Sequence, residues 1–156
     1  RNTADYLCGR FTASVIRITN TNTRTKEDIH MEKVCFKTQK GPAAVGPYST
    51  ATIYGGVIYM SGMIGVNPAT GKAPEGTLAQ AQQVFENIKT VLGELGADMS
   101  DVLKTTVYLT NIAEFGEVNK LYAEAFGPDY PARTCVEVSA LPMGLSIEVE
   151  CIARAK

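Results

Sequence analysis

The chain has 156 residues, with 15 Lys and Arg against 16 Asp and Glu and 45% apolar residues. This length and composition are those of one globular domain, and they exclude an intrinsically disordered chain. No run approaches the roughly 18 apolar residues of a membrane span, and the near-neutral charge, without a Lys/Arg cluster, argues against nucleic acid as a partner.

Residues 1–30 differ in composition from the rest of the chain. They hold five basic and three acidic residues, many Thr and Asn, and almost no periodic apolar pattern. We interpret them as an N-terminal extension to a domain that spans residues 31–156. Two interpretations of the extension stay open: an organelle transit peptide, to which an Arg- and Thr-rich composition is suited, or added upstream sequence. We expect a cytoplasmic protein, with a mitochondrial or plastid location as the alternative.

The domain begins with strand signals. Gly55 and Gly56 stand between two β-rich runs in residues 52–60 and predict a hairpin, with further strand up to Val66. Residues 67–76 are rich in Pro and Gly and predict a loop. A helix should follow over residues 77–95, opened by a capping box of Thr77 and Gln80 and ended by Gly96. Its expected inward stripe is Leu78, Ala81, Phe85, Ile88, Leu92 and Leu95.

The second half of the domain again alternates predicted strands with a predicted helix. Residues 102–110 predict a strand, so a βαβ crossover is implied, and residues 112–126 predict a second helix ended by Gly127 and Pro128. Two strands, 133–140 and 145–154, should close the domain. The expected inward side chains of the second helix are Phe115, Val118, Tyr122, Ala125 and Phe126.

This element order predicts an α+β fold, a mixed β-sheet with both helices packed on one face. Apolar residues occur at both parities of residues 57–66, so the face without helices should also be buried. A homo-oligomer would cover it.

Arg133 is the only basic residue between Lys120 and Arg154, and it begins an otherwise apolar strand. A guanidinium in that setting needs an anion. Two interpretations stay open. Arg133 could bind a substrate carboxylate through two hydrogen bonds, or it could form an ordinary ion pair with a glutamate, for which the candidates are Glu137, Glu148 and Glu150.

Three further polar positions are candidates for a site. Glu148 and Glu150 point to one face of the last strand, as a solvated pair or with one of them as a general acid/base. Asn119 falls on the inward stripe of the second helix, where it could satisfy a backbone group or point a donor into a site. Cys135 shares the strand face of Arg133 and could line the same pocket or be a small buried apolar residue.

The sequence shows no motif for a metal site, for a histidine-activated nucleophile or for a nucleotide-binding loop. The only histidine is His30, outside the patterned domain, and neither Cys-x-x-Cys nor a glycine-rich nucleotide loop occurs. We therefore expect no metal and no nucleotide-binding loop. The four cysteines, Cys8, Cys35, Cys135 and Cys151, are scattered and predict free thiols.

Residues 131–153 (PARTCVEVSALPMGLSIEVECIA) resemble the signature end of the RidA family, the reactive intermediate deaminases also called YjgF-like proteins. The resemblance continues, in order, through GPAAVGPY (41–48), YMSGMIGV (59–66), the loop 67–71 and TTVY (105–108). It covers residues 31–156 and leaves residues 1–30 unexplained.

The resemblance implies a subunit similar in fold to the trimeric chorismate mutases, assembled as a homotrimer with pockets at the subunit interfaces. It implies cofactor-free hydrolysis of enamines and of imines such as 2-iminobutanoate and 2-iminopropanoate to 2-keto acids and ammonia. In this family's pattern Arg133 would bind the substrate carboxylate and Glu148 would position or activate the attacking water. The matching substrate-binding positions are Tyr48, Ser61, Gly62, Asn119 and Cys135.

Some RidA-like proteins are described instead as chaperone-like, or as ribonucleases and translation inhibitors, and these remain the alternatives. Chorismate mutase activity would rest on fold analogy alone and ranks last.

Overall fold

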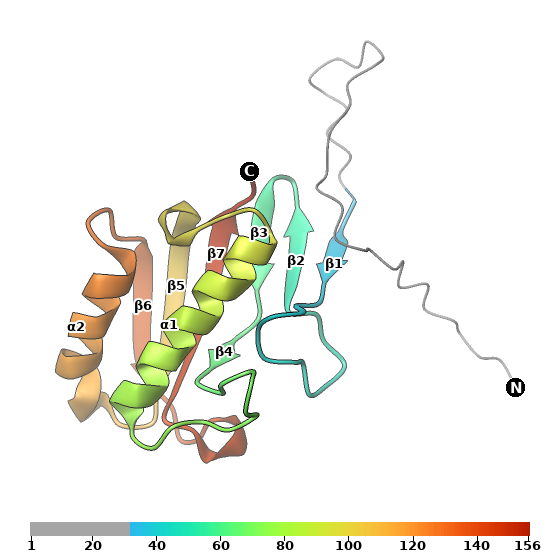
Figure 1. Ribbon diagram of the computed structural model, residues 1–156. Helices are drawn as coiled ribbons and strands as arrows, with labels where there is room; N and C mark the ends of the chain where they lie inside the picture. Colours follow the sequence, from blue (N-terminus) through green and yellow to red (C-terminus); the bar gives the residue numbers. More distant parts are fainter. Residues whose placement is uncertain (1–31) are drawn as a thin grey trace, which may run out of the picture.

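The computed structural model describes residues 32–156 (Figure 1). The extension predicted for residues 1–30, with Cys8 and His30, lies outside the described residues. Within them, the strands are β1 (Val34–Phe36), β2 (Ala51–Tyr54), β3 (Val57–Met60), β4 (Met63–Ile64), β5 (Val102–Leu109), β6 (Ala132–Glu137) and β7 (Ile147–Arg154). The helices are α1 (Thr77–Glu94) and α2 (Phe115–Phe126), and three short 3-10 helices are Met99–Asp101, Ile112–Glu114 and Pro142–Gly144.

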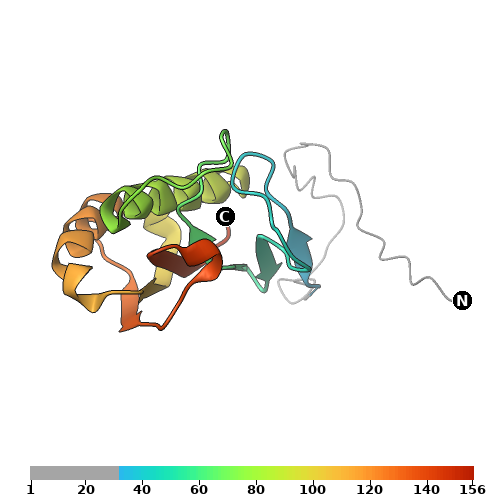
Figure 2. The same ribbon diagram turned by 90° about the horizontal axis from the view of Figure 1, so that it is seen from below.

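The strands form one mixed sheet in the order β1-β2-β3-β7-β5-β6, with β4 also paired to β7. Only β5 and β6 are parallel neighbours, joined through α2 as a βαβ unit. The crossover through α1 connects β4 to β5, and the last strand, β7, lies between these two and pairs with both. Both helices cover the same face of the sheet (Figures 1 and 2), so the predicted α+β fold is confirmed.

The Gly55–Gly56 hairpin is also confirmed. β2 and β3 pair antiparallel with Tyr54 opposite Val57, which leaves only the two glycines in the turn. Their φ angles of 58° and 77° are both left-handed. A two-residue turn with both residues in this region matches the twist of the flanking strands, and glycine adopts it without strain.

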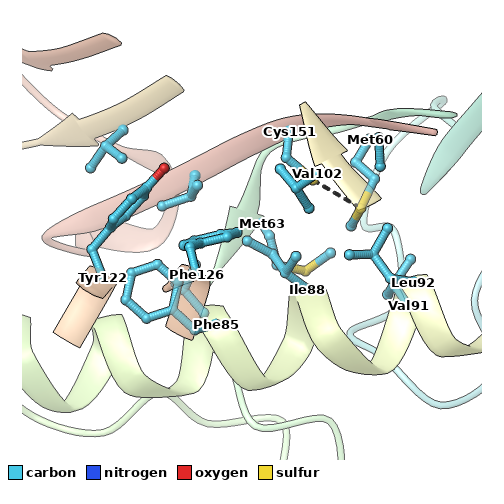
Figure 3. Packing of buried hydrophobic residues seen from close by; sticks show 14 of the residues in the cluster. Met60, Met63, Phe85, Ile88, Val91, Leu92, Val102, Tyr122, Phe126 and Cys151 are labelled. Carbon is cyan, nitrogen blue, oxygen red and sulfur yellow. Dashed lines mark hydrogen bonds between the residues drawn. The ribbon is translucent and has the colours of Figure 1, made fainter. Parts of the chain in front are cut away.

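The core lies between the two helices and the face of the sheet that they cover (Figure 3). From α1, Ile88 and Leu92 are fully buried. The ring of Phe85 meets the ring of Phe126 edge-on, with centroids 5.7 Å apart. The sulfur atoms of Cys151 and Met60 lie 3.2 Å apart in the same core. None of the helices in residues 32–156 is both long and apolar enough to cross a membrane.

The predicted capping box is wrong. Gly76, with φ 82°, occupies the cap position, and Thr77 is the first helical residue. The Thr77 hydroxyl donates instead to Glu114 Oε2 (2.6 Å). The Gln80 amide donates to the Pro74 carbonyl (3.2 Å) and accepts from the Ser146 backbone N–H (2.8 Å). These side chains therefore join α1 to distant segments rather than close its own first turn.

Element ends and two inward assignments also differ. Residues 112–114 form a 3-10 turn, so α2 begins at Phe115. The last two strands are shorter than 133–140 and 145–154. Leu78 is 40% exposed because it lies beside the buried stripe that starts at Thr77, and Phe115 is 38% exposed at the open end of α2.

Candidate active site

Arg133 stands on β6, at the edge of the sheet and under α2. Its Cα pairs with that of Thr105 in β5, whose buried hydroxyl is 2.8 Å from the hydroxyl of Tyr122 in α2. The guanidinium carbon lies 4.5 Å from the centroid of the Tyr122 ring and 5.3 Å from that of Phe115. A cation over two aromatic rings is attracted by their negative faces, which fixes the guanidinium without neutralising it.

None of the three glutamates considered as an ion-pair partner reaches Arg133. Glu137 accepts the Ile112 backbone N–H at 2.7 Å, and Glu150 accepts the Tyr108 hydroxyl at 3.1 Å. The ion pairs within residues 32–156 involve Arg154 and two lysines, but not Arg133. The ion-pair interpretation is therefore wrong for these glutamates, and the exposed guanidinium keeps donors for an external anion.

Cys135 lies beside this arginine on β6, and Asn119 lies on α2 between the two residues whose rings contact it. Cys135 follows on the same face of β6 and is half-buried; burial raises the pKa of its thiol, and the Arg133 charge opposes that rise. Asn119 is half-buried on α2, four residues after Phe115 and three before Tyr122. We call these five residues, Arg133, Cys135, Asn119, Phe115 and Tyr122, the arginine cluster.

Sequence reasoning missed two members of the arginine cluster. Phe115 and Tyr122 were assigned to the core stripe alone, although both also hold the guanidinium. Their spacing around Asn119 was the available signal, since residues three and four apart on a helix share a face.

Glu148 belongs to a second group. Its neighbours on β7, Ile147 and Val149, are fully buried under the helices, so Glu148 points to the other face of the sheet. A Cβ on Gly62 would overlap the Glu148 carboxylate, with the carboxyl carbon only 2.7 Å away. Residue 62 therefore must lack a side chain for Glu148 to lie where it does. Burial raises the pKa of Glu148, and the negative charge of Glu150 raises it further.

A cavity of about 240 Å³ adjoins this glutamate. Tyr48, Ser61 and Gly62 line it, so the structure brings three predicted binding positions together, and Gly62 alone of the three is shown against the Glu148 carboxylate. The Ser61 hydroxyl donates to the Ser49 carbonyl (2.8 Å). Most of the remaining wall is apolar and includes Pro42, Val45, Met63, Ile64, Val66 and Met143. We call Tyr48, Ser61, Gly62 and Glu148 the glutamate cluster.

The loop that carries Tyr48 is fastened to the end of α1. Glu94 accepts hydrogen bonds from the Thr38 hydroxyl and from the Gln39 backbone N–H (2.9 Å), and the Thr38 oxygen in turn accepts from the Gly41 N–H (2.7 Å). A side chain on Gly41 would clash with Val91 of the core. This close approach presses the start of the loop onto the helix and fixes the wall of the cavity.

The two clusters do not meet within one subunit. Arg133 pairs through Thr105 with Cys151, whose side chain is in the core under the helices. Glu148 pairs instead with Tyr108, which is an odd number of residues from Thr105 along β5 and so points to the opposite face. Glu148 therefore lies on the face that the helices leave uncovered. Neither Arg133, Asn119 nor Cys135 lines the cavity beside Glu148. Within residues 32–156, no three His, Cys, Asp or Glu side chains gather as a metal site.

Comparison with known proteins identifies the family of the chain. Residues 38–155 match the family model described as Endoribonuclease L-PSP. The chain is 42% identical over 119 residues to human 2-iminobutanoate/2-iminopropanoate deaminase. The aligned residues make up 76% of this chain and 87% of the human protein. It is 43% identical over 124 residues to Reactive Intermediate Deaminase A, chloroplastic, of Arabidopsis thaliana, with 79% and 66% covered. The crystal structure of the E. coli YjgF gene product superposes with a TM-score of 0.74 at 37% identity, with 79% and 99% covered. The chain belongs to the RidA/YjgF family.

Proposed function

We propose that this protein hydrolyses 2-imino acids and their enamine tautomers, such as 2-iminopropanoate and 2-iminobutanoate, to 2-keto acids and ammonia without a cofactor. The observation that carries the proposal is the guanidinium of Arg133, which is stacked on two rings and has none of the candidate glutamates as a partner. A planar fork of this kind binds a carboxylate through two parallel hydrogen bonds. The printed names of the human and Arabidopsis relatives support the same reaction.

Glu148 supplies the proton transfers. Burial and the charge of Glu150 raise its pKa, which makes its carboxylate a stronger base than that of an ordinary glutamate. Water adds through its oxygen to C2 of the imine, and Glu148 accepts a water proton and passes it to the nitrogen. The hydroxyl proton of the resulting carbinolamine is then transferred through Glu148 to the amino group, the C–N bond breaks with its electron pair going to nitrogen, ammonia leaves, and the C2–O bond becomes the carbonyl. One water is consumed and one ammonia is released.

We propose further that each active site combines the arginine cluster of one subunit with the glutamate cluster of the next in a homotrimer. The support is geometric: Arg133 and Glu148 cannot reach one substrate from opposite faces of one sheet. The uncovered face also carries exposed apolar side chains, among them Tyr59 (44%) and Val136 (39%). A second copy would bury them, and a closed ring of three copies repeats the same contact three times.

The test couples the protein to a serine dehydratase, traps free imine with semicarbazide, and follows the competing formation of pyruvate. The wild-type protein should increase the pyruvate share, and Arg133→Ala should abolish the increase while the oligomer persists on size exclusion. Lys89→Ala, which removes an exposed charge on α1, is the matched control and should behave as wild type. Full activity in Arg133→Ala would exclude the mechanism.

A further inference from the structure

Asn87 is a buried polar residue on α1 that belongs to neither cluster, and it is only 2% exposed. Its Nδ2 donates one hydrogen bond to the carbonyl of Ile64 (3.0 Å) and one to the carbonyl of Val66 (2.9 Å). Its Oδ1 accepts from Nε2 of Gln83, one turn earlier on the helix (2.9 Å). Both N–H groups and the oxygen of this amide therefore have partners, which fixes its orientation.

The two carbonyls that Asn87 binds flank Gly65, where the chain lies directly against α1 (Figure 1). A Cβ on Gly65 would come within 2.7 Å of the Gln80 carbonyl oxygen, so the two backbones are in close contact. A primary amide suits this position, because it offers two N–H donors without the charge that a lysine or arginine would bring into the core. A buried carbonyl that loses its donor is costly, so Asn87 holds residues 64–66 on the helix.

The same segment of chain supports Glu148. Ile64 pairs with Glu148 in the antiparallel ladder of β4 and β7. Two residues earlier, Gly62 lies against the Glu148 carboxylate, where a Cβ would fall 2.7 Å from the carboxyl carbon. β4 has only two residues, Met63 and Ile64. So short a strand has few ladder hydrogen bonds, and the two from Asn87 fix it from the side of α1.

We propose that Asn87 is a positioning residue of the deaminase: by holding the carbonyls of Ile64 and Val66, it keeps Gly62 against the Glu148 carboxylate and excludes water on that side. The inference rests on the proposed function. Glu148 points to the face of the sheet opposite α1, so Asn87 touches no reacting atom and acts through the backbone of residues 62–66. Loss of its two hydrogen bonds would free this segment and admit water beside the carboxylate.

The first test compares the wild-type protein with Asn87→Leu, which keeps the side-chain volume and removes both donors. Imine made by a serine dehydratase is divided between the protein and semicarbazide, and calorimetric titration with 2-oxobutanoate gives Kd. The rate of pyruvate formation should fall about 10- to 100-fold, the effect of a misplaced proton-transfer group. Kd should stay unchanged, because Arg133 binds the carboxylate of the keto acid. A rate and an affinity that fall together would indicate general damage and overturn the inference.

The second test follows the titration of the Glu148 carboxyl by carbon-13 NMR, assigned with Glu148→Gln, and does not depend on activity. Burial raises the pKa of Glu148, so the carboxyl should titrate at lower pH in Asn87→Leu, where water reaches it. An unchanged titration would overturn the inference. The other charged or titratable side chains on its face of β3, β5 and β7 do not differ between the two proteins, nor does Arg133 of the neighbouring copy; they are Tyr59, Lys104, Tyr108, Glu150 and Arg154.

Two further variants keep the test decisive. Leu92→Ala opens a cavity in the core further along α1; it should lower the thermal midpoint and leave the rate and the titration at their wild-type values. Gln83→Met removes the hydrogen bond that orients the Asn87 amide and should change both in the direction of Asn87→Leu, by a smaller amount. It replaces Asn87→Leu in the comparison if that variant does not fold.

The outcomes separate the two proposals. Full activity in Asn87→Leu, or in Gln83→Met where only that variant folds, would overturn the role of Asn87 and leave the deaminase intact. An equal loss of rate in Leu92→Ala would do the same. No acceleration of imine hydrolysis by the wild-type protein would overturn both.

Discussion

Arg133 and Glu148 lie on opposite faces of one sheet: Arg133 is under α2 against Tyr122, and Glu148 is on the uncovered side against Gly62. The register between β6, β5 and β7 fixes this separation, because Arg133 aligns with Cys151 and Glu148 aligns with Val136 through their partners in β5. A substrate that needs both residues must lie between two copies of the chain.

Subunit mixing tests this relationship. Arg133→Ala and Glu148→Gln should each be inactive alone, whereas a mixture that is unfolded and refolded together should recover about one quarter of the wild-type activity, since one interface in four then has both residues intact. The same proteins mixed without refolding are the control. A refolded mixture as inactive as its parents would place both residues in one subunit.

Gly62→Ala should reduce kcat by about 10²-fold or more, because the added Cβ displaces the carboxylate that moves the protons. Gly93→Ala is the matched control: a Cβ at Gly93, inside α1, meets nothing within 4 Å. It should keep full activity and raise the free energy of unfolding by about 0.5–1 kcal/mol. Semicarbazide competition and urea unfolding measure the two effects. Equal activity of the two variants would contradict the role given to Gly62.

Phe115→Leu keeps an apolar side chain beside Arg133 and removes the ring face. We expect KM for the imino acid and Kd for the 2-keto acid product to rise about 3- to 10-fold, the effect of losing one cation–π contact. The thermal midpoint should change little, because Phe115 is partly exposed. Calorimetric titration with 2-oxobutanoate measures Kd, and Phe115→Tyr, which keeps a ring, should retain it. An unchanged Kd in the leucine variant would show that the ring does not hold the guanidinium.

The pH dependence follows from Glu148. Its pKa is raised by burial and by Glu150, so kcat/KM should rise with pH through a pKa above that of an ordinary glutamate. Glu150→Gln removes the negative charge, keeps an acceptor for the Tyr108 hydroxyl, and should move this limb to lower pH. The folded state binds the Glu148 proton more tightly than the unfolded state, so this group's contribution to stability is lost as pH rises through the raised pKa. A pH profile that is identical in the variant would exclude the coupling.

Asp101 anchors the C-terminus, and its substitution should affect stability but not catalysis. Its side chain is 1% exposed and accepts from Arg154 (2.7 Å) and Lys156 (2.8 Å). A hydrogen bond from Lys156 and, to a smaller extent, one from Arg154 lower the pKa of Asp101. Its contribution to stability is therefore present above the ordinary Asp pKa and lost as pH falls through the lowered value. Asp101→Asn should lower the thermal midpoint at pH 7, with a gap to wild type that narrows on acidification. A gap independent of pH would contradict this.

The sequence predicts the fold well where the signal is local. Gly55–Gly56 and the apolar stripe of α1 lead directly to the observed hairpin and helix. It fails where the partner is distant: Thr77 resembles a cap but bonds Glu114, 37 residues away. β1 was not expected, because its three residues, Val34–Phe36, are partly exposed at a sheet edge and carry no alternation.

For the site, the resemblance supplies Arg133 and Glu148, but no pattern within the sequence reveals that they face apart. The sequence of one strand shows which of its own side chains share a face. Which residues of two different strands share a face depends on the register in which the strands pair. That register is a tertiary property, fixed here by the insertion of β7 between β3 and β5.

A single chain has a complete core, because both helices bury their stripes on their own sheet. It carries only unmatched halves of the proposed site. If two copies complete the proposed site, dilution below the dissociation constant of the oligomer should leave the protein folded by circular dichroism but inactive, so that its specific activity would depend on its own concentration.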